Sequence, residues 1–312
     1  MMRRFNPAVA GAFLALASCT PAGQLYEPVP ANLGEAVVVG NDTLYRVSGR
    51  GYVLLSGRRE ALPDVKQALD LAAVRWRGFF GTEPPSATVL LRDSSTAELS
   101  EQDVRGLGRG PLVGLTGGAA APVRPMDPGP AGPRQVPTPV RRAPAEPVVE
   151  AWIRSFVDSV AGRGGRRGDP AAIPDWVEIG LVELVGGSGM PEVAASRLRR
   201  DQRLLSLPEL FSSRQPAAPM PAAGERDRQP RRRTLDDALA DPAERYSLQS
   251  ALVMQFLIER GGLTVPRHLL TELPRGRPIG EALAAAGISP ADPAALEEPW
   301  REWLGEVGTP RR

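Results

Sequence analysis

Two stretches of this sequence are too rich in Gly and Pro, and too poor in large apolar side chains, to belong to a packed core. Residues 105–147 contain 8 Gly and 10 Pro and no aromatic residue. Residues 212–233 contain four Pro, end in three consecutive Arg and lack Val, Ile, Leu and aromatic residues. Ordering the backbone costs about 1 to 2 kcal/mol per residue, which so little apolar burial cannot offset. We predict two flexible insertions, in which only residues 112–115 and 122–126 could form edge strands.

The remaining sequence predicts strands first and helices afterwards. A hairpin is expected at residues 45–47 and 51–55 with its turn at Gly49 to Gly51, then a helix at 62–80 that stops at Gly81, and then a short buried strand at 87–91. Apolar stripes with helical spacing follow at residues 149–160, 176–184, 248–259, 265–273, 279–286 and 294–306. The fold class is therefore predicted as α+β, with a small N-terminal mixed sheet and helix followed by a mainly helical lobe.

The single Cys and the single His exclude whole classes of sites. One Cys forbids an internal disulfide, a redox pair or a cysteine zinc site, and one His forbids a zinc or haem site built on two imidazoles. A Ser-His-Asp triad could be built only around His268, and a lone His on a helix is more often a surface or core residue. We expect no metal and no cofactor.

The first 18 residues have the order of a secretory signal peptide. Arg3 and Arg4 form a basic start, residues 8–17 are apolar apart from Gly11, and small residues precede Cys19. This apolar run is too short to span a bilayer as a permanent helix. Residues 16–19, Leu-Ala-Ser-Cys, resemble the bacterial lipobox, whose Cys becomes the first mature residue and carries a diacylglyceryl group on its sulfur. The alternative is an ordinary signal peptide with an incidental Cys.

A lipid on Cys19 would hold the protein on a membrane surface outside the cytoplasm. Each buried CH₂ group of the acyl chains contributes about 0.8 kcal/mol, so several chains, palmitate among them, anchor a protein stably. Thr20 follows the Cys where an Asp would favour inner-membrane retention in such lipoproteins, which points to the outer membrane. Removal of Arg3 and Arg4 leaves 36 of the 38 basic residues against 36 acidic ones. A neutral mature chain gives no electrostatic support for nucleic-acid binding.

One helix-forming stretch carries a family resemblance. Residues 173–184, Ile-Pro-Asp-Trp-Val-Glu-Ile-Gly-Leu-Val-Glu-Leu, resemble a motif of the peptidase-MA-like gluzincins, which are zinc metallopeptidase-type domains. In that family the motif reads Pro-x-Trp-hydrophobic-x-Glu-Gly-hydrophobic-Ala-Glu-aromatic and supplies the third metal ligand. The matching residues here are Trp176, Gly180, Leu181 and Glu183. Residues 246–257 resemble the following helix of the family, and residues 279–287 and 300–304 resemble its closing region. The resemblance covers residues 45–305.

The chain departs from this family at the metal ligands. Members carry His-Glu-x-x-His on the preceding helix, because the i and i+4 spacing puts both imidazoles on one face beside a Glu that activates zinc-bound water. In the preferred register the two His positions are Trp152 and Phe156, and the Glu position is Ile153. The third ligand position falls on Ile179. A second register over residues 149–153 would keep Glu150, but it contains no His.

These replacements predict a peptidase-like domain without catalysis. A catalytic zinc needs three protein ligands and a water, and all of the protein ligands are missing. Tyr246 matches a family position whose phenol can stabilise an oxyanion, and Glu183 matches the second Glu of the ligand helix. Alternatively, Tyr246 packs at a helix start and Glu183 forms a local salt bridge. We expect the former metal cleft to be filled by core side chains, since a buried charge without its metal would cost several kcal/mol.

The expected function is binding or scaffolding by an exported, lipid-anchored protein of the cell envelope. Its expected partners are the bilayer, through Cys19, and an envelope protein or peptide. One alternative is a hydrolase that uses non-metal chemistry at Glu150, Glu183 and Tyr246, and another is a purely structural protein whose residues 105–147 contact a partner. The predicted organisation is a signal peptide at 1–18, anchor and linker at 19–44, a β/α subdomain at 45–104, an insertion at 105–147, a helical lobe at 148–306 that contains the insertion 212–233, and a tail at 307–312.

Overall fold

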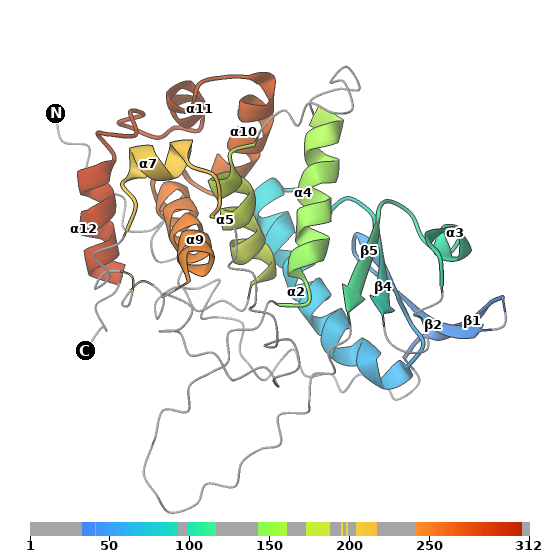
Figure 1. Cartoon of the computed structure of the whole chain (residues 1–312). Coiled ribbons are helices and arrows are strands. Elements are labelled where there is room, and N and C mark those ends of the chain that lie inside the picture. Colours follow the sequence, from blue (N-terminus) through green and yellow to red (C-terminus); the bar gives the residue numbers. More distant parts are fainter. Residues whose placement is uncertain are drawn as a thin grey trace, which may run out of the picture.

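The computed structural model describes residues 33–40, 42–92, 96, 99–116, 143–160, 173–187, 195, 198, 204–216 and 241–307. They form an α+β fold in which a mixed sheet precedes a group of helices, as predicted (Figure 1). The strands are β1 (Glu35–Val39), β2 (Asp42–Gly49), β3 (Tyr52–Ser56), β4 (Ala87–Arg92) and β5 (Leu112–Thr116). The helices are α2 (Leu62–Phe80), α3 (Glu101–Val104), α4 (Glu146–Val160), α5 (Asp175–Gly186), α7 (Leu207–Ser212), α9 (Pro242–Gly261), α10 (Val265–Glu272), α11 (Ile279–Ala285) and α12 (Glu297–Val307), with short 3₁₀ turns η1 (Arg59–Ala61) and η2 (Leu273–Arg275).

The sheet has the order β1-β2-β3-β4-β5. The predicted hairpin is formed by β2 and β3, which pair antiparallel with Gly49 opposite Tyr52. β1 pairs antiparallel with β2, whereas β4 and β5 continue from β3 as parallel strands. Parallel neighbours need a crossover connection, and α2 supplies it between β3 and β4.

Helix α2 begins and ends as its sequence predicts. Pro63 lies in its first turn, where the missing N–H costs no hydrogen bond. Gly81 adopts φ +69°, and its N–H donates to the carbonyl of Arg77 at 2.8 Å, which closes the last turn. The buried face of this helix carries Trp76 and Phe80 toward the core.

Both faces of the sheet are covered. α2 packs on β2 and β3, and α4 packs on β4 and β5. On the opposite face, next to α3, a small cluster contains Val39, Leu44, Leu55, Leu90, Leu99 and Val104. Neighbouring residues such as Leu54 and Leu55 therefore enter different clusters, which explains why β3 and β4 read as continuous apolar runs.

The helices share the larger core with the sheet. α5 lies between α4 and α9 and packs against both (Figure 1). One continuous cluster of buried side chains runs from Tyr52 of β3 through Trp176 of α5 to Trp300 of α12. The predicted strand-rich and helical parts are thus joined by a single apolar core.

The structure adds elements in three regions that the sequence assigned to linker or insertion. β1 lies inside residues 19–44, which the sequence assigned to anchor and linker; this strand is held by its pairing with β2 and not by burial of its side chains, since Val38 is 73% exposed. The predicted insertion 105–147 contains β5, the edge strand expected at 112–115, whose Leu115 is buried, and the first residues of α4. Helix α7 was not predicted, and it reaches into the insertion 212–233 by one residue.

Several predictions concern residues outside the described ranges. These are the signal peptide and Cys19, the strand expected at 122–126, and most of the insertion 212–233. Within the described ranges, no helix combines the length and the apolar character that crossing a membrane requires.

Candidate functional site

The two positions that the resemblance assigns to His ligands belong to an aromatic cluster. Trp152 is fully buried and meets the ring of Trp76 edge to face, with 5.9 Å between centroids. Phe156 contacts Trp76 at 6.1 Å and Phe80 at 5.2 Å, while Trp76 and Phe80 stack at 4.0 Å. Such edge and offset contacts stabilise aromatic pairs beyond their burial. We call Trp76, Phe80, Trp152 and Phe156 the aromatic cluster.

The indole of Trp152 is directed toward the sheet. Its Nε1 donates a hydrogen bond of 3.0 Å to the carbonyl of Gly51, in the turn between β2 and β3. This bond satisfies the only polar atom of a side chain that is otherwise surrounded by apolar groups. Ile153, at the predicted position of the general base, is also fully buried.

Helix α5 places the third ligand position against the core. Ile179 is half-buried and packs on the main apolar cluster. Its neighbour Gly180 faces α9 so closely that an ideal Cβ there would lie 2.7 Å from the carbonyl oxygen of Ser250. Glycine is required at this position because a side chain would push the two helices apart.

The three residues of the possible residual cleft have separate surroundings. The Tyr246 hydroxyl donates to the carbonyl of Ser213 at 3.2 Å, and burial raises the Tyr246 pKa to about 12. Glu183 is half-buried near the end of α5, where an ideal Cβ on Gly187 would lie 3.0 Å from its Oε2. Glu150 forms an ion pair with Arg154 on the exposed side of α4. Tyr246 therefore stays protonated at neutral pH and is engaged by the main chain.

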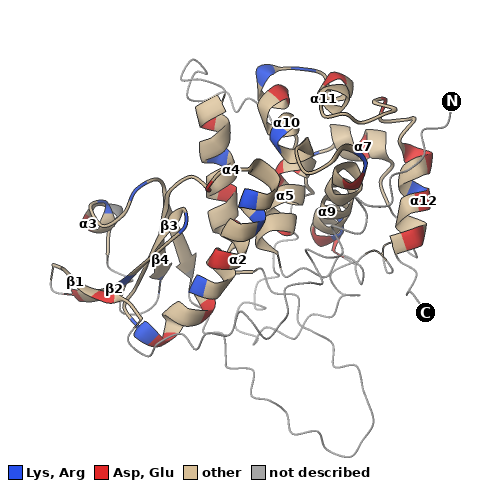
Figure 2. Cartoon of the chain, turned by 180° about the vertical axis from the view of Figure 1, so that it is seen from behind, with Lys and Arg blue, Asp and Glu red and all other residues tan. Residues whose placement is uncertain are grey.

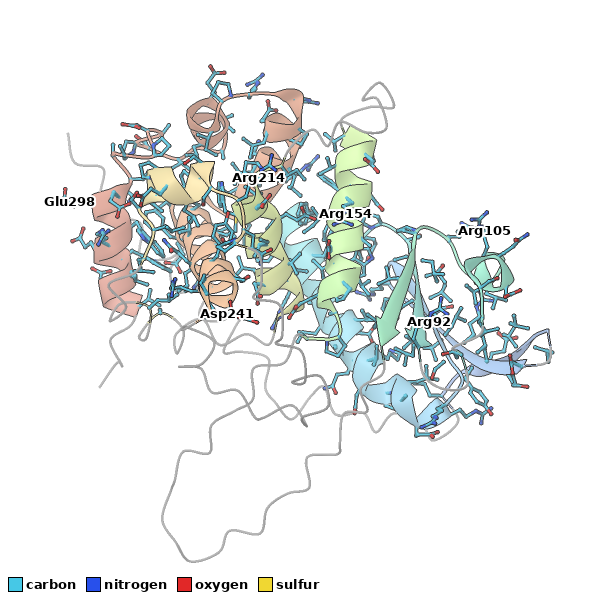
Figure 3. All side chains as sticks on the ribbon, in the orientation of Figure 1. Arg92, Arg105, Arg154, Arg214, Asp241 and Glu298 are labelled. Atoms are coloured by element: carbon cyan, nitrogen blue, oxygen red, sulfur yellow. The ribbon has the colours of Figure 1, made fainter. Side chains whose placement is uncertain are left out.

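The guanidinium of Arg154 joins α4 to α5 near the predicted ligand positions. Arg154 pairs with Glu150 on its own helix and approaches Glu178 of α5, with 3.4 Å between Nε and Oε1 (Figure 3). Burial raises the pKa of Glu178, while Arg154 acts in the opposite direction. Acidic and basic residues both occur along α4 (Figure 2), whereas the charged residues of α5 are all acidic. Within the described residues, no group of three or more His, Cys, Asp or Glu side chains is arranged to hold a metal ion.

A second basic residue, Arg75, was not anticipated from the sequence. Its guanidinium extends from α2 to the end of α5 and donates to the carbonyls of Val185 at 3.3 Å and Gly187 at 2.8 Å. Burial lowers its pKa from the ordinary Arg value. Arg75 thus caps α5, whose last carbonyls have no partner within the helix. No sequence pattern connects two residues so far apart.

His268, the one imidazole, is half-buried on α10.

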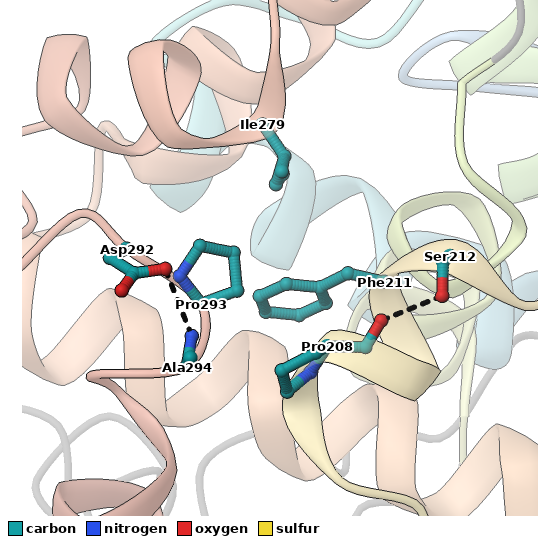
Figure 4. Close-up of a pocket in the computed structure, with 7 residues that line it drawn as sticks. All are labelled: Pro208, Phe211, Ser212, Ile279, Asp292, Pro293 and Ala294. Carbon is teal, nitrogen blue, oxygen red and sulfur yellow. Dashed lines mark hydrogen bonds between the residues drawn. The ribbon is translucent and has the colours of Figure 1, made fainter.

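Two surface pockets of the described chain lie away from the aromatic cluster and from the predicted cleft residues. The larger, about 260 Å³, lies between α7, the start of α11 and the loop before α12 (Figure 4). Its lining is Pro208, Phe211, Ser212, Ile279, Asp292, Pro293 and Ala294. The smaller, about 80 Å³, lies between α3 and the start of β5. Neither is lined by the predicted ligand or cleft residues.

Comparison with known proteins yields no relative. The chain matches no protein-family model, no curated protein and no solved structure.

Proposed function

We propose that this protein is a lipid-anchored lipoprotein of the cell envelope, and that it acts as a binding or scaffolding module built on a peptidase-like domain that does not cleave peptides. The resemblance of residues 173–184 to the gluzincin ligand helix supports the peptidase-like frame. The aromatic cluster is the observation on which the proposal depends, because it contains Trp152 and Phe156, the two positions that the resemblance assigns to His ligands.

The packing of this cluster argues against a metal at the same place. A zinc ion needs three ligands with lone pairs at about 2.0 to 2.3 Å. Trp152 and Ile153 are instead fully buried, and the single polar atom of the indole is already bonded to Gly51. A charged ligand introduced among these rings without its metal would be desolvated at a cost of several kcal/mol, so apolar residues stabilise the position.

The first test measures metal content and peptide cleavage. Full-length protein is extracted from membranes, incubated with zinc, desalted and subjected to elemental analysis, and a library of peptides is assayed with and without a chelator. We expect much less than one zinc per chain and no cleavage. Stoichiometric zinc, or cleavage that the chelator abolishes, would contradict the proposal.

The same assay addresses hydrolysis without a metal. Cleavage that resists the chelator but is lost on Tyr246→Phe would favour the hydrolase alternative. Tyr45→Phe is the matched control, because Tyr45 lies on β2 under the guanidinium of Arg59 and far from α9 in the fold.

The anchor is tested by fractionation. Wild-type protein should remain with membranes after a carbonate wash, and Cys19→Ser should release it, because the thiol that would carry the acyl chains is gone. Thr20→Ser, one residue further along, should fractionate as wild type. Retention of the Cys19→Ser variant on membranes would refute anchoring through this residue.

A further inference from the structure

Strand β1 forms one edge of the sheet, and no other segment of the described chain pairs with its outer side. The hairpin of β1 and β2 extends away from the helices in both views of the chain (Figure 1, Figure 2). α2 packs on β2 and β3, whereas β1 packs chiefly on β2. The sheet of the described chain therefore ends in an open strand edge.

Two residues of β1 direct their main-chain groups to this open edge. Hydrogen-bonded and non-hydrogen-bonded pairs alternate along antiparallel strands. Val39 lies opposite Asp42 across a two-residue turn, and the pair that closes such a turn is hydrogen-bonded. Val37 therefore uses its N–H and carbonyl on β2, while Ala36 and Val38 present theirs outward.

The side chains of β1 lack the features that usually protect an exposed edge. Natural edge strands carry Lys, Pro or a bulge, but β1 reads Glu-Ala-Val-Val-Val, and Glu35 is its only charge. Val38 is the most exposed large apolar side chain of the described residues, and Ala36 on the same face is exposed as well. On the other face, Val37 and Val39 belong to the cluster beside α3. The edge thus combines free main-chain groups with apolar side chains on both faces.

We propose that β1 pairs antiparallel with β1 of a second copy of this chain, which joins the two sheets into one. Pairing centred on Val37 places Ala36 of each copy opposite Val38 of the other, and these outward residues exchange both hydrogen bonds in each pair. Glu35 then lies opposite Val39 of the second copy, so no like charges face each other.

The distribution of charge along β1 selects this arrangement. Parallel pairing in register would place Glu35 beside Glu35 of the second copy, and directly opposed like charges are destabilising. The antiparallel register centred on Val37 pairs all five residues of the strand and puts Val37 on the two-fold axis. Because the same surface is used by both copies, the contact closes as a dimer and does not continue into a fibre.

The size of the contact indicates where the dimer forms. Standard protein interfaces bury about 1,200 to 2,000 Å², and a pair of five-residue strands buries less. We therefore expect little dimer in dilute solution and more where a lipid on Cys19 concentrates chains on one surface. This dependence on a surface rests on the proposed anchor, whereas the pairing of β1 does not.

Cysteine cross-linking on membranes tests both the pairing and its register. Opposed residues of a non-hydrogen-bonded pair have Cα atoms about 4.5 Å apart, within the range of a disulfide, so Val37→Cys in the full chain should give a covalent dimer on oxidation with copper phenanthroline. Val38→Cys should give about tenfold less, because the two Val38 residues are diagonal neighbours about 7 to 8 Å apart. This order is opposite to the order of exposure, since Val37 is half-buried and Val38 exposed. The wild-type chain, whose one thiol is Cys19, gives the background.

Two exposed positions allow the same test without disturbing the packing of Val37. Chains with Ala36→Cys and chains with Val38→Cys, produced together, should cross-link to each other across about 5.5 Å, and neither chain should do so alone. Val38→Lys added to Val37→Cys should lower the dimer yield about tenfold, because it places a charge in both opposed pairs. Val74→Lys is the matched control and should leave the yield unchanged, since Val74 is exposed on α2.

Failure of the mixed Ala36→Cys and Val38→Cys chains to cross-link would overturn the inference. So would a dimer yield at Val37→Cys no greater than at Val38→Cys, or equal losses through Val38→Lys and Val74→Lys. If fractionation finds the chain soluble, cross-linking is done at about millimolar concentration, the effective concentration of tethered sites. The zinc, chelator and fractionation assays do not involve β1, so failure of the proposed function and failure of the pairing are distinguishable.

Discussion

The contact between α5 and α9 can be tested with one substitution, Gly180→Ala. An ideal Cβ at this position would lie 2.7 Å from the carbonyl oxygen of Ser250 and 3.3 Å from the Cβ of Met254. The nearest atom belongs to the backbone of a long helix, so α5 has to move away from α9. Overpacking of this kind costs about 1 to 3 kcal/mol. Alanine regains about 1 kcal/mol of helix propensity relative to glycine. Because the clash is with backbone, we take the upper part of the range and expect a net loss of about 1 to 2 kcal/mol.

Gly78→Ala provides the matched control for the same chemical change. Gly78 lies on the exposed side of α2, and an ideal Cβ there has no neighbour within 4 Å. This variant should therefore gain about 0.5 to 1 kcal/mol. Urea unfolding followed by far-ultraviolet circular dichroism would measure both free energies. Equal stabilisation of the two variants would refute the close packing of α5 on α9.

Three further predictions concern single side chains. Trp152→Ala should lower the free energy of unfolding by about 3 to 5 kcal/mol, because the ring is fully buried in the aromatic cluster; a loss below 1 kcal/mol in urea unfolding would show that the cluster is loosely packed. Arg75→Met should destabilise by about 1 to 2 kcal/mol through loss of the charged hydrogen bonds that cap α5, whereas Arg77→Met, at an exposed ion pair with Glu83, should cost less than about 0.5 kcal/mol. The pKa of Glu178 is raised above 4.5 in the folded chain. The folded state therefore holds an extra proton just above that pH, so stability contributed by this group is present at low pH and declines as pH rises through the folded pKa. Glu178→Gln should flatten that part of the stability profile, and an unchanged profile would contradict the assignment.

The sequence predicted the elements that are fixed by local rules. The period of apolar residues located α2, α4 and α5, and Gly81 marked the end of α2 because a left-handed residue there is best supplied by glycine. β1 was missed because Val38 points to solvent and the strand depends on its pairing with β2. α7 was missed because six residues are too few to show a helical period, and the ring that holds Phe211 belongs to α5.

The sequence likewise predicted only part of the candidate site. The apolar character of Trp152, Ile153 and Phe156 was evident, since all three lie on one stripe of a predicted helix. Their partners could not be inferred, because the indole of Trp152 bonds to a turn in the sheet and its ring meets an aromatic residue on α2. The capping of α5 by Arg75 was equally hidden, since it joins residues more than a hundred positions apart.

The bond from Trp152 to Gly51 has a consequence for the order of folding. The two residues are 101 positions apart, whereas the β2–β3 hairpin joins near neighbours. Closing a long loop has to precede any contact across it, so distant pairings slow the passage over the folding barrier. The hairpin and α2 can form early, while the docking of α4 waits for the chain to return to the sheet. Substitutions in the β2–β3 hairpin should therefore slow folding, whereas substitutions at Trp152 should chiefly accelerate unfolding.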